Sequence, residues 1–281
     1  MKIYLIGISG MLGSKLFENF LNIEKFIIRG SSRDLPKKFK INKRFIDLDL
    51  DINNLDLVKE KIKKFKPNLV INCVGVIKQK IYKDADQKNI FYVNSFFPHE
   101  LYKITQFVNA RLIHFSTDCV FNGNKGNYSE IDEPNSKDLY GLSKRLGELD
   151  YPNSLTLRTS IIGHEIKNKY GLLEWFLSQD KKCYGYSNCF FSGFPTDEIF
   201  NILLKIINNK KIFGIYHLSS SRISKLDLLL KISKIYNKKI VIKKNDKLKI
   251  DRSLKSNKLK KLINYKSPNW NNLILNMYKN Q

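Results

Sequence analysis

The stretch Lys2-Ile3-Tyr4-Leu5-Ile6-Gly7-Ile8-Ser9-Gly10-Met11-Leu12-Gly13 decides the fold of this chain. Its first half is a short apolar run, which predicts a buried strand. Three glycines then predict a tight turn, and the large apolar residues that follow have the spacing of a helix: Leu16, Phe17 and Phe20. Strand, glycine turn and helix in this order predict the opening of an α/β fold with a parallel sheet.

The same turn is suited to binding a dinucleotide. Glycines allow the backbone to approach a pyrophosphate closely, and the helix that follows directs its N-terminus at the anion. The spacing is Gly-x-x-Gly-x-x-Gly, which differs from the more familiar Gly-x-Gly-x-x-Gly. Without further context, an ordinary connection between a strand and a helix stays open as the alternative.

Tyr140 and Lys144 are the candidate catalytic pair. Residues four apart on a helix project from one face, so a phenol and an ammonium group can converge on one carbonyl. A cation beside the phenol would lower its pKa from about 10 and make it a better acid at working pH. We expect Thr117, in Ser116-Thr117-Asp118, to donate a second hydrogen bond to the same oxygen. Without the other motifs, the alternative is a surface Tyr and Lys on an ordinary polar helix, with no catalytic role.

Three motifs together resemble the extended short-chain dehydrogenase/reductase family. They are the glycine turn, the run Ser116-Thr117-Asp118-Cys119-Val120-Phe121-Asn122-Gly123, and Tyr140-Gly141-Leu142-Ser143-Lys144 with Gly147-Glu148. Within that family the chain is most similar to dTDP-4-dehydrorhamnose reductases and related nucleotide-sugar ketoreductases. The resemblance implies a doubly wound parallel sheet of the Rossmann type, with a smaller C-terminal substrate lobe. We expect a dinucleotide-binding core over residues 1–162 and the lobe over residues 163–281, of which about 197–236 return to the main sheet.

The resemblance also implies roles for individual residues. Catalysis would depend on Thr117, Tyr140 and Lys144. The cofactor would contact Gly7, Gly10, Met11, Leu12, Gly13, Ser32, Arg33, Asp47, Leu48, Cys73, Val74, Gly75, Asn94, Tyr140 and Lys144. The substrate would contact Asp118, Val120, Phe121 and Arg252, although a solvated Arg252 is an equal alternative. We expect Asn94 at the start of a helix, and residues 183–196 as an aromatic binding loop.

The choice of cofactor depends on the residues after the second strand. We expect this strand to end near Ile28, before Arg29-Gly30-Ser31-Ser32-Arg33. An acid at this position would bond the ribose of NAD, whereas an Arg can pair with the extra phosphate of NADP. Ser32 and Arg33 therefore favour NADPH, with a solvated loop Arg as the alternative.

Composition limits the remaining possibilities. The 281 residues are 42% hydrophobic, enough for one large core, and the net charge is +24. The lysines are spread along the whole chain, so we interpret the charge as compositional bias and expect no nucleic-acid partner. Four Cys without a Cys-x-x-Cys pair and four scattered His predict neither a disulfide framework nor a metal site. We expect a cytoplasmic protein without membrane insertion, and leave a homodimer open.

The resemblance implies an NADPH-dependent reductase of the keto group, expected at C4, of a nucleotide-activated deoxysugar or related sugar, in the synthesis of surface-polysaccharide precursors. Related dehydratases carry a Glu where this chain has Cys119, so we rank dehydration low. An epimerase and a non-catalytic NADP-binding regulatory subunit remain alternatives.

Overall fold

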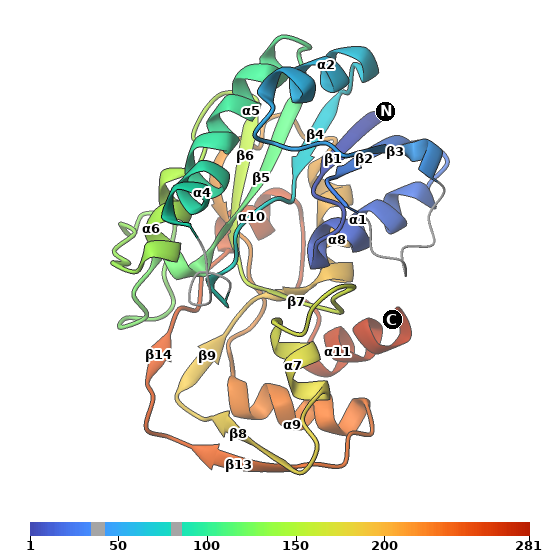
Figure 1. Ribbon diagram of the computed structural model, residues 1–281. Coiled ribbons are helices and arrows are strands. Elements are labelled where there is room, and N and C mark those ends of the chain that lie inside the picture. Colours follow the sequence, from blue (N-terminus) through green and yellow to red (C-terminus); the bar gives the residue numbers. More distant parts are fainter. Residues whose placement is uncertain (35–42, 80–85) are drawn as a thin grey trace.

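The computed structural model of the chain describes residues 1–34, 43–79 and 86–281. Its centre is a sheet of seven parallel strands in the order β11-β6-β5-β4-β1-β2-β3 (Figure 1). The strands are β1 (Lys2–Ile6), β2 (Ile27–Ser32), β3 (Ile46–Leu48), β4 (Leu69–Asn72), β5 (Arg111–Thr117), β6 (Ser154–Thr159) and β11 (Gly214–His217). The strand order reverses between β1 and β4, as in a doubly wound fold. The predicted fold class is confirmed.

The two faces of the sheet are covered by separate apolar layers. Ile3 and Leu5 of β1 pack into one core, whereas Tyr4 and Ile6 pack into the other. Successive side chains of a strand point to opposite faces, which explains why β1 is apolar throughout. The first layer is formed by α1 (Met11–Leu21) and α8 (Thr196–Ile206), and the second by α2 (Leu55–Phe65) and α5 (Phe97–Gln106) (Figure 1).

The seventh strand comes late in the chain. After β6 the chain leaves the main sheet, and it returns through α8 to β11, which pairs in parallel with β6. Phe20 of α1 and Phe200 of α8 meet edge to face, with ring centroids 4.9 Å apart. The C-terminal part of the chain therefore completes the same sheet that the N-terminal part begins.

The remaining elements form a smaller lobe (Figure 1). Its strands pair as β10-β7, β12-β9-β14 and β13-β8. These elements are β7 (Ile161–Ile162), α7 (Leu172–Leu177), β8 (Lys182–Tyr186), β9 (Cys189–Phe191), β10 (Phe194–Pro195), β12 (Ile223–Ser224), α9 (Lys225–Ile235), β13 (Val241–Asn245), β14 (Ile250–Asp251) and α11 (Trp270–Lys279). Helix α10 (Asn257–Leu262) lies instead beside the main sheet, in contact with β11 (Figure 1). The expectation of a loop over residues 183–196 is wrong, since strands β8, β9 and β10 form there by pairing with distant segments.

Two expected element boundaries are also wrong. Strand β2 continues to Ser32 because Gly30 and Ser31 pair with β1 on one side and β3 on the other. Asn94 does not begin a helix: α4 (Gln87–Phe91) precedes it and continues through a π-helical turn, η2 (Tyr92–Phe96), into α5. Pro98 lacks the N–H that would bond the carbonyl of Asn94 in an α-helix, which favours a wider turn here.

Among the described residues, no helix combines the length and the apolar character needed to cross a bilayer.

Candidate active site

The glycine turn lies where β1, β2 and β4 end. Gly7 has a φ of +87°, and its N–H donates to the carbonyl of Ser31 over 3.0 Å. A Cβ atom on Gly7 would lie 2.7 Å from Cγ2 of Val74, and one on Gly13 would lie 2.2 Å from the carbonyl oxygen of Gly7. Both positions therefore require glycine. Gly10 is the N-cap of α1 and brings no side-chain hydrogen bond to it, so the first N–H groups at Met11 and Leu12 face the turn.

Tyr140 and Lys144 project from α6 (Leu139–Leu146), next to the end of β5. The Asp138 carboxylate caps this helix by accepting from the N–H of Gly141 over 2.9 Å. Thr117, the last residue of β5, is buried, and its hydroxyl accepts from the N–H of Cys119 over 3.1 Å. A hydrogen bond also joins Thr117 to Tyr140. The structure thus brings the three predicted catalytic residues together at the carboxyl end of the sheet.

The phenol of Tyr140 is held in its protonated form. Burial raises its pKa above the ordinary value, and the nearby Cys119 and Asp118 raise it further, while the hydrogen bond with Thr117 lowers it. This direction is opposite to the lowering that the Tyr-x-x-x-Lys pattern predicts. The reason is that burial dominates and that the Lys144 ammonium donates to the Phe115 carbonyl over 2.7 Å.

Lys144 itself is buried and has a lowered proton affinity. Burial lowers its pKa to about 8, and the charge of Glu148 opposes that shift. Its Nζ atom also lies 3.5 Å from Nε2 of His114. A Cβ atom on Gly75 would lie 3.9 Å from the same Nζ, so the loop after β4 passes directly by Lys144.

Asn94 joins this loop to the catalytic helix. Its Oδ1 accepts from the N–H of Val76 over 2.8 Å, and its Nδ2 donates to the carbonyl of Val76 and to Oγ of Ser143. Ser143 lies between Tyr140 and Lys144 in α6 and donates to the Tyr140 carbonyl over 2.9 Å. Asn94 therefore holds the backbone of the loop after β4 next to the catalytic helix. The thiol of Cys73, in the same loop, is neutral because burial raises its pKa to about 12.

The residues expected near the adenosine end lie at the carboxyl ends of β2 and β3. Asp47 is not free to bind a ligand through both oxygens, since it accepts from Nη2 of Arg29 over 2.8 Å and from the Tyr4 hydroxyl over 2.8 Å. Although burial opposes it, these bonds lower the Asp47 pKa. Ser32 donates to the carbonyl of Asp34 over 2.7 Å. Arg33 and Leu48 are exposed.

The predicted substrate residues have mixed positions. Val120 and Phe121 are fully buried, and Phe121 stacks on Tyr128 with ring centroids 4.2 Å apart. Their side chains therefore support the loop after β5 rather than line an open surface. Arg252 donates through Nε to the carbonyl of Phe121 over 2.8 Å, which brings the C-terminal segment to the site. Asp118 is buried beside Thr117, whose hydroxyl lies 3.2 Å from its Oδ1.

Sequence reasoning missed a buried ion pair beneath the site. Arg158 of β6 donates two hydrogen bonds to Glu148, over 2.8 and 2.7 Å, and both side chains are at most 5% exposed. Ser116, next to Thr117, donates to the same carboxylate over 2.7 Å. Glu148 belongs to the motif Gly147-Glu148, but nothing in the sequence indicates that it pairs with Arg158.

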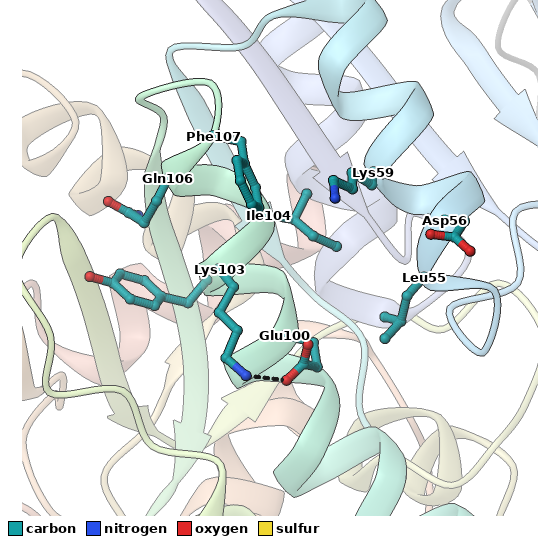
Figure 2. A pocket seen from close by; sticks show the side chains of 9 residues that line it. Leu55, Asp56, Lys59, Glu100, Lys103, Ile104, Gln106 and Phe107 are labelled. Atoms are coloured by element: carbon teal, nitrogen blue, oxygen red, sulfur yellow. Dashed lines mark hydrogen bonds and ion pairs between the residues drawn. The ribbon is translucent and has the colours of Figure 1, made fainter.

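A pocket outside this site lies between α2 and α5 (Figure 2). It is lined by residues that include Leu55, Lys59, Glu100, Lys103 and Phe107, and none of the catalytic residues contributes to it. The ammonium of Lys59 lies 4.7 Å from the centre of the Phe107 ring. Within residues 1–34, 43–79 and 86–281, no group of three or more metal-ligating side chains occurs.

Comparison with known proteins extends these observations. A family model described as the RmlD substrate binding domain matches residues 1–281. A dTDP-4-dehydrorhamnose reductase from Aggregatibacter actinomycetemcomitans is 31% identical over 185 residues, which cover 60% of this chain and 61% of that protein. The beta subunit of methionine adenosyltransferase 2 from Danio rerio is 26% identical over 172 residues, covering 59% of this chain and 49% of that protein. The matches thus span about half to three fifths of these relatives.

Solved structures share the fold along the whole chain. The dTDP-4-dehydrorhamnose reductase from Bacillus anthracis, crystallised with NADP, superimposes with a TM-score of 0.81 at 21% identity, covering 99% of this chain and 98% of that one. The corresponding protein from Clostridium acetobutylicum gives a TM-score of 0.80 at 21% identity, with 99% of each chain covered.

Proposed function

This chain belongs to the RmlD substrate binding domain family, and we propose that it is an NADPH-dependent reductase of the keto group, at C4, of a nucleotide-activated deoxysugar. The observation that carries this proposal is the convergence of Thr117, Tyr140 and Lys144 beside the Gly75 loop. The family relationship accounts for the fold, and the three side chains supply the chemistry.

The glycine turn fits a dinucleotide. Side chains at Gly7 and Gly13 would fill the space against the turn, and Gly10 leaves the N-terminus of α1 open to an anion. Together with Met11, Leu12, Cys73, Val74 and Gly75, these residues would hold the pyrophosphate and the nicotinamide ribose. Asn94 would support them from behind, and Lys144 would reach the ribose.

The exposed Arg33, with Ser32 and Leu48 close by in the chain, favours NADPH over NADH. Asp47 would contribute through its backbone, since its carboxylate is bonded internally.

The residues of this chain would then act on the substrate carbonyl. NADPH supplies a hydride when it is bound. Thr117 donates a hydrogen bond to the carbonyl oxygen, and Tyr140 gives that oxygen a proton. Because burial keeps the pKa of Tyr140 high, its phenol carries a proton at neutral pH. In its protonated form, Lys144 would hold the ribose and balance the charge left on the phenolate.

Cys119 argues against elimination of water. Burial, with the charge of Asp118, raises the pKa of its thiol to about 12. A neutral thiol cannot abstract a proton as the Glu of a dehydratase does. Reduction is therefore favoured over dehydration at this site.

The sugar nucleotide would bind between the core, residues 1–162, and the lobe, residues 163–281. Asp118 and Arg252 would contact it directly, whereas Val120 and Phe121 would shape the loop from inside. The product would enter surface-polysaccharide synthesis in the cytoplasm. A homodimer is compatible with this proposal, which requires neither nucleic acid nor a membrane.

A regulatory subunit is the second candidate, because relatives named as the beta subunit of methionine adenosyltransferase 2 match half of this chain. The retained Thr117, Tyr140 and Lys144 favour the enzyme. An epimerase is the third candidate, since it can use the same Tyr and Lys while its cofactor is regenerated.

One assay separates the three candidates. The protein is incubated with NADPH or NADH and a panel of 4-keto-6-deoxy sugar nucleotides, and both nicotinamide absorbance and product mass are followed. Reduction predicts equimolar loss of NADPH and a product two mass units heavier, with NADPH preferred to NADH. Product without net NADPH loss would favour the epimerase. Tight NADPH binding with no product from any substrate would favour the regulatory subunit.

A further inference from the structure

Asn72, at the end of β4, has a fixed amide orientation. The backbone N–H of Val74 donates to its Oδ1 over 3.0 Å, and a backbone N–H requires an acceptor. The Nδ2 group must therefore point the other way, toward Nδ1 of His114 on the neighbouring strand β5, 3.1 Å away. Asn72 is 1% exposed and His114 is completely buried.

This contact determines the tautomer of His114. Burial lowers the pKa of the imidazole well below its ordinary value, and the charge of Lys144 lowers it further, so the ring is neutral. The Asn72 amide donates to Nδ1, which must then be the nitrogen without a proton. The proton lies on Nε2, the nitrogen that faces Nζ of Lys144 at 3.5 Å.

An N–H group that faces an amine favours one protonation state of that amine. A neutral Lys144 can accept a hydrogen bond from Nε2–H, whereas an ammonium would place two donors against each other. Lys144 would keep its donated bond to the Phe115 carbonyl in either state.

We infer that Asn72 and His114 form a positioning pair that presents an N–H group to Nζ of Lys144 and favours its neutral form. The pair acts on the lysine and not on the substrate. Its relevance to catalysis depends on the proposed reductase activity, but its effect on Lys144 does not.

Other groups near Lys144 act separately from this pair. Glu148, just beyond the end of α6, favours the ammonium, but its carboxylate is bonded to Arg158 and Ser116. Burial of Lys144 acts in the same direction as His114. A test must therefore change the N–H group while leaving burial and Glu148 in place.

The test replaces His114 with two amides of different length. In His114→Gln the amide can turn its oxygen toward Nζ, so an acceptor replaces the donor. In His114→Asn, the matched control, the amide can still pair with Asn72 but is too short to contact Lys144. The ligand-free protein is labelled with carbon-13 at the lysine Cε atoms, and its NMR spectrum is followed with pH. Lys144 is identified by the signal that Lys144→Met loses.

In the wild type we expect Lys144 to titrate at about 8. His114→Gln should raise this value by about one pH unit, and His114→Asn by less, because it removes the donor without supplying an acceptor. The pH profile of kcat should shift in the same direction, with little change in KM for NADPH. Unchanged titration of Lys144 in the folded His114→Asn and His114→Gln proteins would overturn the inference, even if reductase activity is found. Shifted titration without reductase activity would support it and count against the proposed function alone.

Discussion

At the scale of single residues, burial sets the protonation states of the side chains around Thr117. Tyr140 and Cys119 are both protonated because burial raises their pKa values, and each shares a hydrogen bond with Thr117. Lys144, one turn away, has its pKa lowered to about 8. One acid and one readily titrated base are thus held side by side.

Removing the phenolic oxygen of Tyr140 tests its role as the acid. We expect Tyr140→Phe to lower kcat by at least about 100-fold, the usual contribution of a positioned acid. Its affinity for NADPH, measured by nicotinamide fluorescence, should stay close to wild type because the ring is retained. Lys144→Met should lower both kcat and the affinity for NADPH. A Tyr140→Phe protein that keeps more than roughly a hundredth of the wild-type rate would show that the proton comes from elsewhere.

The sequence indicated Thr117, Tyr140 and Lys144 because their motifs are local. It did not indicate Asn72 and His114, because their contact joins two strands that are neighbours only in the folded sheet. The sequence also did not predict the direction of the Tyr140 pKa shift, since spacing predicts which groups share a helix face but not how deeply they are buried. Which of the expected ligand contacts exist stays a prediction.

At the scale of elements, the π-helical turn η2 allows Asn94 to join three segments. The turn ends just before Pro98, and the Asn94 side chain bonds both backbone groups of Val76 and the hydroxyl of Ser143. On the opposite side, a Cβ atom on Gly147 would lie 1.9 Å from the Asn94 carbonyl oxygen. The loop after β4 and the helix α6 therefore keep one fixed separation.

Truncating this side chain should loosen both segments. We expect Asn94→Ala to lower the free energy of unfolding by about 2 to 4 kcal/mol, because it removes a buried side chain and leaves partly buried backbone groups of Val76 without partners. Urea unfolding measures the loss. Asn89→Ala, an exposed position in α4, is the control and should change stability by less than about 0.5 kcal/mol. Equal losses in the two variants would contradict the joining role of Asn94.

Strands and helices of the core were predictable because each one combines a clear apolar period with glycine or polar residues at its ends. Residues 183–196 were not, because β8, β9 and β10 are short and are stabilised by pairing with β13, β12 and β7. Asn94 was misplaced because a proline usually marks the start of a helix, whereas here a π-helical turn accommodates it within one.

At the scale of the whole molecule, buried histidines make stability depend on pH. His217 of β11 is completely buried next to Arg158. Burial, with the charge of Arg158, lowers its pKa from 6.5 to about 4. The unfolded chain therefore binds a proton at a higher pH than the folded protein does, and stability is lost as pH falls through this window.

We expect the free energy of unfolding to decrease by about 3 kcal/mol between pH 7 and pH 4 through His217, with a further loss through His114. Urea unfolding at several pH values measures this slope. His217→Gln should have a shallower slope over the same range, because its side chain does not titrate. Equal slopes in wild type and variant would exclude His217 as a source. The carboxylates of Asp47 and Asp138 have pKa values lowered from 3.8, so the stability that they contribute is present above that pH and is lost as pH falls below it.

The arrangement of the sheet has a consequence for synthesis of the chain. All six residues of β6 are buried, and one edge of this strand pairs only with β11. In the sequence, residues 160–213 separate β11 from β6. A ribosome therefore releases β6 well before it makes its partner. During that interval the nascent chain presents an open, apolar strand edge, the type of surface that pairs with other chains or recruits chaperones. Chains that terminate before Gly214 would keep that edge permanently, so premature termination in the second half would produce aggregation rather than a smaller folded protein.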